Sequence, residues 1–171
     1  GRIKAGDRRI YDSPAQNATS HYLNTMLYVA GPSADESAYP AELYGENYRA
    51  KDIESADTQY LRVLTGTGIK ISFIASHSSP ESVGPVTQFI FEKGIIEFDA
   101  SEKGETYRVL SGSDELNIEL FPSQPPEKNR ADVFDDVFEA IREGRAPLCS
   151  IENALPHVLC IQTLFEESCP V

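Results

Sequence analysis

The chain has 171 residues, which is long enough for one domain with a buried core. Hydrophobic residues make up 40% of the sequence, as in ordinary globular proteins, and the net charge is −12. Proteins that bind nucleic acids usually present a basic face, and here the basic residues form only short clusters within residues 2–9 and 128–130. No apolar run approaches the ~20 residues that cross a membrane. We therefore expect neither a nucleic-acid partner nor a membrane partner.

The cysteines indicate the compartment. There are three of them, Cys149, Cys160 and Cys169, without any C-x-x-C pair. This pattern favours a reducing environment over a disulfide framework, and it is not a zinc-binding pattern. The first residues lack the apolar centre of a signal peptide. These features predict a cytoplasmic protein, and the missing initiator methionine leads us to expect that the chain is part of a longer one.

The first strong element in chain order is a helix predicted over residues 14–30, after a short strand within residues 8–11. Ser13 can cap the first turn, Pro14 suits the first helical position, and Gln16 completes a capping box. Gly31, followed by a proline, ends the helix. The side chains on one side of this helix are apolar, namely Tyr22, Leu23, Met26, Leu27, Val29 and Ala30.

The other side of this helix carries a polar stripe, made of Asn17, His21, Asn24 and Tyr28. Such a stripe either faces solvent or lines a cavity. Residues 13–34 contain no Lys, Arg, Asp or Glu, whereas a solvated helix face in this chain would usually carry some charge. This favours a wet cavity, where amides can hold a polyhydroxylated ligand and the histidine can carry a proton. Asp12 either points into the same cavity or favours the helix N-terminus.

From residue 41 the sequence alternates apolar and polar residues, as strands do. Strands are expected over residues 41–49, 58–65, 69–77, 85–92, 95–99, 106–110 and 116–121. The links between them are mostly tight turns, and a parallel crossover needs a dozen or more residues. The strands should therefore pair antiparallel in a large meandering sheet.

Two helices are expected after the proline-rich segment at residues 122–128. Asn129 caps the first, and Gly144 ends it. The second runs from about Ile151 to Glu167, with Ser150 or Asn153 as its cap, and Pro156 favours a start near Asn153. Helix, strands and two further helices predict a single α+β domain over residues 1–171, with a large, mostly antiparallel sheet and helices on one face.

No nucleotide-binding or metal-binding motif is present. The chain has neither G-x-G-x-x-G nor a phosphate-binding G-x-x-x-x-G-K-[ST] sequence, and with three histidines a three-histidine metal site would need all of them. We expect no cofactor or metal on this chain alone. His77, at the end of the strongest strand, is either a ligand contact or a core or turn hydrogen-bonding residue. His157 is expected at the surface or in the first turn of the last helix.

The residues quoted above resemble a known family. The run D-S-P-x-x-N-A-x-x-H-x-L-x-x-M-L from Asp12 to Leu27, with F-x-A-S-H at Phe73–His77, resembles the C-terminal half of Gfo/Idh/MocA-type oxidoreductases. The sequence F-x-A-I-R-x-G-R-x-P at Phe138–Pro147 and S-x-E-N-A at the start of the last helix also fit. The likeness covers the whole chain and agrees with the order of elements.

The resemblance implies an NAD(P)-dependent dehydrogenase of a sugar, cyclitol or related polyhydroxy compound. NAD or NADP would be bound mainly by an N-terminal Rossmann domain that this chain does not contain. His21 matches the proton-transferring histidine of the family's D-x-x-x-H motif. Asn17 and Asn24 stand where the family has aspartates, and an amide orients a hydroxyl but does not ionise. The family's open sheet face also implies a homo-oligomer.

Two hypotheses from different classes follow. In the first, the chain is the substrate-binding and oligomerisation domain of such a dehydrogenase, with His21 catalytic and Asp12, Asn17, Asn24 and His77 contacting substrate. In the second, it is a stand-alone binding or oligomerisation module without catalysis. An isomerase or hydrolase using the same cavity has little support, because His21 has no identifiable carboxylate partner in the sequence.

Overall fold

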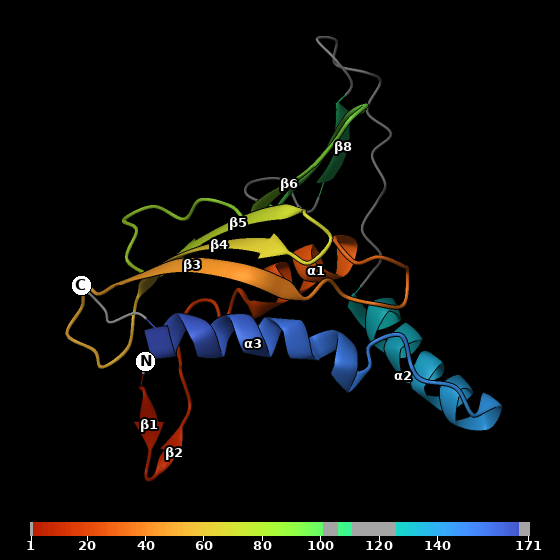
Figure 1. Cartoon of the computed structure of the whole chain (residues 1–171), viewed down its shortest axis with the longest axis horizontal. Helices are drawn as coiled ribbons and strands as arrows, with labels where there is room; N and C mark the ends of the chain where they lie inside the picture. Colours follow the sequence, from red (N-terminus) through yellow and green to blue (C-terminus); the bar gives the residue numbers. More distant parts are fainter. Residues whose placement is uncertain (1, 101–105, 111–125, 168–171) are drawn as a thin grey trace. The chain divides into compact units, whose positions relative to one another are not determined.

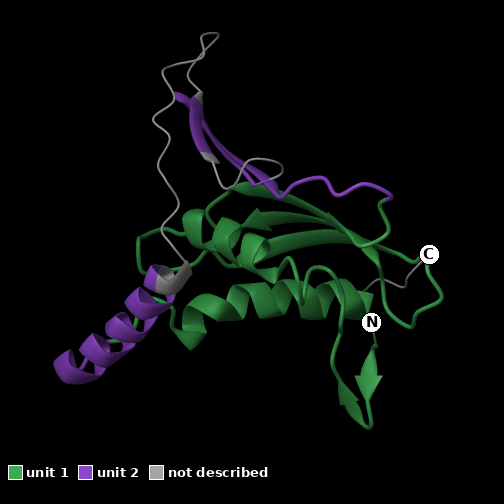
Figure 2. Cartoon of the chain, turned by 180° about the vertical axis from the view of Figure 1, so that it is seen from behind, with its two compact units in different colours: residues 1–79, 146–171 green, residues 80–145 purple. Residues whose placement is uncertain are grey.

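The computed structural model describes residues 2–100, 106–110 and 126–167. The strand expected at 116–121 lies outside these residues. The chain divides into two compact units, residues 1–79 with 146–171 and residues 80–145, coloured separately in Figure 2. In the part that the structure describes, no helix combines the length and the apolar character needed to span a bilayer.

The first unit contains a three-stranded antiparallel sheet covered on one face by two helices (Figure 1). Its strands are β3 (Pro40–Tyr48), β4 (Thr58–Thr65) and β5 (Lys70–Ser76), and its helices are α1 (Ser20–Val29) and α3 (Ile151–Glu167). Alternate side chains of β4 and β5 are buried, as the predicted period of two requires. They form one core with both helices, made of Leu23, Leu27, Leu61, Val63, Ile71, Phe73, Ala75, Cys160, Ile161 and Leu164.

A glycine allows α3 to lie close to the sheet. A Cβ atom added to Gly45 on β3 would stand 2.2 Å from Cδ1 of Leu164 on α3. Leu164 is 1% exposed and therefore has little room to move. The absence of a side chain at Gly45 is thus what lets the helix pack on the middle of β3.

A two-stranded hairpin, β1 (Lys4–Ala5) with β2 (Arg8–Arg9), also belongs to the first unit. Its turn contains Gly6 at a φ of 60°, a conformation that glycine adopts without strain. The predicted strand at residues 8–11 is therefore shorter than expected. Tyr11 leaves the hairpin and stacks on Phe165 of α3, with ring centroids 4.9 Å apart.

The second unit contains another antiparallel meander and a helix. The strands are β6 (Val86–Phe91), β7 (Gly94–Asp99) and β8 (Thr106–Leu110), and the helix is α2 (Pro126–Glu143). The α+β class and the antiparallel pairing are as predicted, with the described strands distributed over three small sheets. The helix begins at Pro126 rather than after Asn129, because proline is well suited to a first helical position.

The start of α1 differs most from the prediction. Residues 14–19 form turns, and the regular helix begins at Ser20. The expected capping bond is absent among the described residues, where the buried hydroxyl of Ser13 has no partner. The backbone N–H of Gln16, which a capping box would bind, donates to the carbonyl of Ser13 at 3.2 Å, and the N–H of Ala15 donates to Oε1 of Gln59 at 2.9 Å.

The helix α3 begins at Ile151, as predicted, and the structure decides between its two candidate caps. Ser150, not Asn153, caps the helix, since its hydroxyl accepts the backbone N–H of Asn153 at 3.2 Å. Pro156 lies inside the helix and cannot donate to the carbonyl of Glu152. The hydroxyl of Tyr39 donates to that carbonyl at 3.5 Å, so the proline is tolerated.

Candidate functional site

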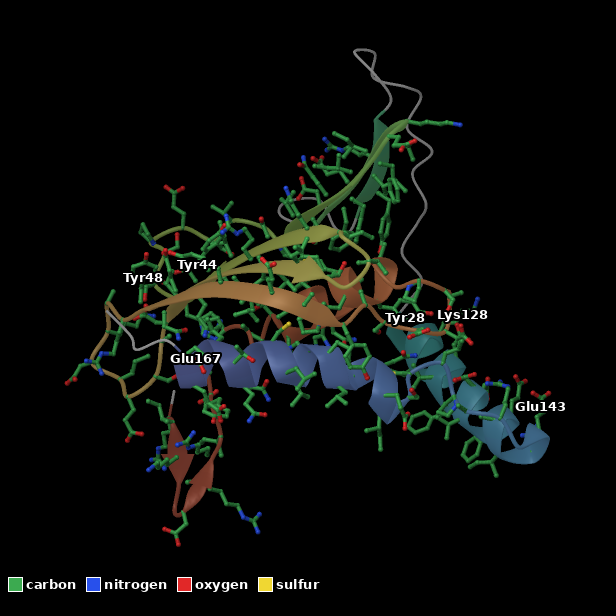
Figure 3. The ribbon with its side chains drawn as sticks, viewed as in Figure 1. Tyr28, Tyr44, Tyr48, Lys128, Glu143 and Glu167 are labelled. Carbon is green, nitrogen blue, oxygen red and sulfur yellow. The ribbon has the colours of Figure 1, made fainter. Side chains whose placement is uncertain are left out.

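The polar stripe predicted on the first helix is present on α1. His21 is exposed at its beginning, Asn24 is half-buried one turn later, and Tyr28, labelled in Figure 3, is 36% exposed near its end. Leu23 and Leu27 on the same helix are fully buried in the core. The packing of these leucines fixes the rotation of α1, and with it the direction of the stripe.

A chain of buried amides holds the segment that leads into α1. Gln59 on β4 accepts the N–H of Ala15 and donates its own Nε2–H to Oδ1 of Asn47 on β3, at 2.7 Å. Asn47 in turn donates to the backbone carbonyl of Leu164 on α3, at 3.2 Å. Gln59 is 0% exposed and Asn47 is 1% exposed. This amide relay therefore ties the lead-in segment to both the sheet and α3 in a region without competing water.

The lead-in segment brings two predicted site residues together. Nδ2 of Asn17 donates to Oδ1 of Asp12 at 3.1 Å. This bond leaves the carbonyl oxygen of the Asn17 amide available to a ligand and places a carboxylate beside the amide. The sequence pattern lacked a carboxylate partner for this position, and the fold supplies one from five residues earlier.

Sequence reasoning missed His157 as a member of this site. It is half-buried on α3, and its Nε2 lies 3.2 Å from the carbonyl oxygen of Ala15. Burial lowers the pKa of His157, the nearby charge of His21 lowers it further, and the bond to Ala15 opposes both. The two imidazoles thus lie on facing helices. The only sequence signal was the spacing of Asn153 and His157, which puts both on one face of α3.

A small pocket lies further along the same stripe. It has a volume of about 210 Å³ and is bounded by α1, by the loop after α1 and by the start of α3. The residues that line it are Asn24, Thr25, Tyr28, Ser37, Leu148, Cys149 and Asn153. Two residues of the predicted stripe, Asn24 and Tyr28, therefore border this pocket.

Asn153 builds the walls of this pocket. Its Oδ1 accepts the N–H of Ser37 at 3.0 Å, and its Nδ2 donates to the carbonyls of Asp35 and Leu148 at 2.9 and 3.0 Å. The residue is 8% exposed. A single side chain therefore joins the loop after α1 to the segment before α3, and its hydrogen-bonding groups are occupied by that task.

His77 is not joined to these residues. It follows β5, is exposed, and its backbone N–H donates to the carbonyl of Asp57 at 2.7 Å, while its carbonyl accepts from Lys51. In the described part of the chain it shares neither a hydrogen bond nor a pocket with the residues of α1. In the structure, His77 is a strand-end residue whose backbone is hydrogen-bonded to a loop.

Asp57 organises that loop. It is 2% exposed, and its Oδ2 accepts the backbone N–H groups of Ala50 and Lys51 at 2.9 and 2.7 Å. Burial disfavours the charged carboxylate, but these bonds and one from the Thr58 hydroxyl outweigh it, so the pKa of Asp57 is lowered. Asp57 therefore has a structural explanation and need not belong to the site.

The described residues hold no cluster of three or more His, Cys, Asp or Glu side chains that could bind a metal ion. Every strand in residues 2–100 and 106–110 that pairs does so antiparallel. These residues therefore provide no strand–glycine turn–helix unit of the kind that cradles a dinucleotide.

The second surface of interest is the open face of the β3–β4–β5 sheet, on the side away from α1 and α3. Tyr44 and Tyr48 project from this side in Figure 3, and they are 49% and 41% exposed. Both hydroxyls donate to the carboxylate of Glu46, which lowers the pKa of Glu46. Arg62 lies over the ring of Tyr44, with 5.4 Å between its guanidinium carbon and the ring centroid.

Comparison with solved structures identifies the fold. Aldose-aldose oxidoreductase from Caulobacter crescentus, complexed with glycerol, superposes with a TM-score of 0.70 at 18% identity, over 90% of this chain and 44% of that one. UDP-N-acetylglucosamine 3-dehydrogenase GnnA from Acidithiobacillus ferrooxidans gives 0.68 at 14% identity, over 88% and 46%. The chain has the fold of the C-terminal domain of Gfo/Idh/MocA-type oxidoreductases.

A third Gfo/Idh/MocA-type structure has both of its ligands bound. WlbA dehydrogenase from Bordetella pertussis, in complex with NADH and UDP-GlcNAcA, gives a TM-score of 0.59 at 17% identity, over 91% of this chain and 44% of that one. This chain therefore spans a little under half the length of these proteins. No protein-family profile matches the sequence, and no curated protein matches it significantly. The Gfo/Idh/MocA resemblance read from the sequence is thus confirmed for the fold.

Proposed function

We propose that this chain is the substrate-binding C-terminal domain of an NAD(P)-dependent oxidoreductase that acts on a sugar, cyclitol or related polyhydroxy compound. The observation that carries the proposal is the polar stripe of α1 on a Gfo/Idh/MocA fold, with His21 between the Asp12–Asn17 pair and the pocket at Asn24. The solved neighbours that handle glycerol and nucleotide sugars support the substrate class.

In this proposal, His21 accepts the proton of the substrate hydroxyl that is oxidised, and it returns the proton in the reverse reaction. It is exposed, so a substrate hydroxyl can reach its imidazole. The Asn17 amide orients a neighbouring hydroxyl, and Asp12 holds that amide in place. NAD or NADP, held by a domain outside this chain, would take up the hydride.

Asp12 places a carboxylate beside Asn17, which stands where the family has an aspartate. An amide cannot ionise, but the Asp12 carboxylate that accepts its N–H can fix the direction in which the amide carbonyl faces a substrate hydroxyl. We therefore assign Asn17 the orienting role and Asp12 the role of positioning Asn17. Asn24 contacts the substrate from the pocket side, and the proposal does not depend on His77.

We also propose that two copies associate through the open face of the β3–β4–β5 sheet. The exposed tyrosines on it, together with Arg62 and Glu46, give both aromatic surface and charges of opposite sign. Such a face can pair with its own copy about a two-fold axis. Light scattering of the purified protein should give the mass of an oligomer, and the substitution Tyr44→Glu should reduce it to that of a monomer.

The cytoplasm is the compartment that fits this function. The odd number of cysteines and the lack of a C-x-x-C pair support this part of the proposal.

The test of the proposed function uses the full reading frame that encodes this chain. The codons before Gly1 should encode a strand–glycine turn–helix unit, and the purified product should reduce NAD or NADP when supplied with a polyhydroxy substrate. A frame that begins near Gly1, or a product that binds sugars without reducing either cofactor, would favour the stand-alone binding module instead.

A further inference from the structure

One hydroxyl of the pocket beside α1 is left without a partner. Ser37, in the loop after α1, is 2% exposed, and among the described residues its Oγ has no hydrogen-bond partner. A buried hydroxyl without a partner costs stability, and such groups are uncommon in folded proteins. Because Ser37 lines the pocket, a ligand there can provide the missing bond.

Other polar groups around the pocket are available as well. Asn24 and Thr25 on α1 make no side-chain hydrogen bond within the described part of the chain, and Cys149 contributes an exposed thiol. Asn153, in contrast, is fully engaged in holding the walls. The pocket thus offers one amide and two hydroxyls, which both donate and accept, beside the apolar surfaces of Leu148 and Tyr28.

The charge around the pocket selects against anions. None of its seven lining residues is charged. The charged residues next to them in the sequence are acidic, Glu36 beside Ser37 and Glu152 in the first turn of α3. Glu152 also offsets the positive end of the α3 dipole, which would otherwise attract a phosphate or carboxylate.

The size of the pocket suits part of a small molecule. Its volume of about 210 Å³ is several times the roughly 30 Å³ that one water molecule occupies in the liquid. It begins one helical turn after His21, since Asn24 and Thr25 follow that histidine by three and four residues. A ligand whose reacting hydroxyl is near His21 can therefore extend a substituent into it.

We propose that this pocket binds a neutral, hydroxyl- or amide-bearing group of a polyhydroxy ligand, with Ser37 as the buried hydrogen-bonding anchor. The identification of that ligand as the oxidised substrate rests on the proposed function. Binding itself does not, because it requires only residues of this chain. The pocket sets specificity by accepting neutral substituents and rejecting anionic ones.

Cys149 provides a direct assay. It is exposed and lines the pocket, whereas burial raises the pKa of the Cys160 thiol to about 12 and keeps it unreactive near neutral pH. In a Cys169→Ser background, the rate of Cys149 alkylation by iodoacetamide is measured with N-acetylglucosamine, with myo-inositol and with the anionic sugar glucuronate. The full 171-residue chain is used without cofactor.

At ten times its Kd, at least one of the two neutral probes should slow alkylation about tenfold, because only about one protein in eleven is then free. Glucuronate at the same concentration should leave the rate unchanged. Alkylation that neither neutral probe slows overturns the proposal. Protection by glucuronate as strong as that by the neutral probes overturns the selectivity on which it rests.

Matched serine variants test the anchor. Ser37→Ala should raise the Kd of the protecting sugar about threefold to tenfold, the loss of one neutral hydrogen bond. Ser55 is also fully buried with an unpartnered hydroxyl, but it does not line the pocket, so Ser55→Ala should leave the Kd unchanged. Thr25→Val, which keeps the side-chain shape, should also raise the Kd. Equal Kd values for Ser37→Ala and Ser55→Ala would refute the role of Ser37.

The two proposals fail separately. Absence of protection in the alkylation assay removes the pocket as a binding site and does not touch the proton-transfer role of His21. If the full-length protein does not reduce NAD or NADP, the proposed dehydrogenase function is refuted. Protection of Cys149 from alkylation by a bound sugar would then be a property of a binding module.

Discussion

Replacing Gln59 by leucine tests the amide relay that holds the start of α1. Gln59 bonds Ala15 in the lead-in segment and Asn47 on β3, and all three residues are at most 1% exposed. Leucine has a similar size but can neither accept nor donate. The backbone N–H of Ala15 and Oδ1 of Asn47 would therefore both lose a partner in a region closed to water.

The expected loss follows from these two groups. A buried polar group left without its partner costs about 1–3 kcal/mol, so two of them predict a loss of about 2–6 kcal/mol in the free energy of unfolding. That is a large part of the stability of an ordinary domain, about 5–15 kcal/mol. The variant should unfold at a clearly lower urea concentration, with an unchanged slope if the native state stays compact.

Gln162→Leu is the matched control. Gln162 is an exposed glutamine of α3 that bonds only Glu166 of its own helix, so the same substitution there should change stability by less than about 0.5 kcal/mol. Urea unfolding followed by circular dichroism compares the two variants. Equal midpoints for Gln59→Leu and Gln162→Leu would refute the argument that the relay fixes the lead-in segment.

Three further predictions concern packing and pH. Gly45→Ala should lower the free energy of unfolding by about 1–3 kcal/mol in urea titrations, because its methyl group meets Leu164; wild-type stability would contradict this. Asp57→Asn should lower the free energy of unfolding by about 2 kcal/mol at pH 7. Because the native pKa of Asp57 is lowered, the difference in stability between wild type and variant should shrink as the pH falls below about 4. A pH-independent difference would contradict the role of the carboxylate. Because the pKa of His157 is lowered in the folded state, the unfolded chain binds a proton at this residue at a higher pH than the folded chain does. Wild-type stability should therefore fall as the pH drops from about 6.5 to the lowered pKa. His157→Gln should remove this part of the dependence of stability on pH, and an unchanged dependence in thermal unfolding would exclude the contribution of His157.

Local sequence patterns were sufficient to predict the helices and strands whose contacts are made mainly with residues nearby in the sequence. The alternation in residues 58–65 predicted β4 with its observed bounds, and the helical spacing after Ser150 predicted α3 to Glu167. Links too short for a parallel crossover were enough to predict the antiparallel pairing within each sheet of the described residues. In each case the forces that decide the structure act over a few residues along the chain.

The start of α1 could not be predicted in the same way. Its capping signals were strong, but Gln59, 44 residues away, binds the backbone N–H of Ala15 in the predicted first turn. Likewise, His157 joins the site through Ala15, 142 residues earlier. Neither partner is visible in a local pattern, because the fold alone determines which segments meet.

Only some of the predicted site residues meet in the structure. Asn24 lines the pocket beside α1, and a hydrogen bond joins Asn17 to Asp12, whereas His21 is not among the residues that line that pocket. Ser37 and Cys149 were absent from the prediction, since they reach the pocket from loops whose course depends on the Asn153 side chain. Loop residues held by distant side chains carry no periodic signal.

The most direct test of the central claim is the steady-state turnover of the full-length enzyme carrying His21→Gln. If His21 transfers the substrate proton, kcat should fall about 10²- to 10⁴-fold, the usual contribution of a general acid–base group, while KM and the unfolding midpoint change little. The neutral side chain of glutamine keeps a hydrogen-bonding group on α1 but cannot carry the proton. A kcat equal to that of the wild type would contradict the assignment of His21 and the account of the site built around it.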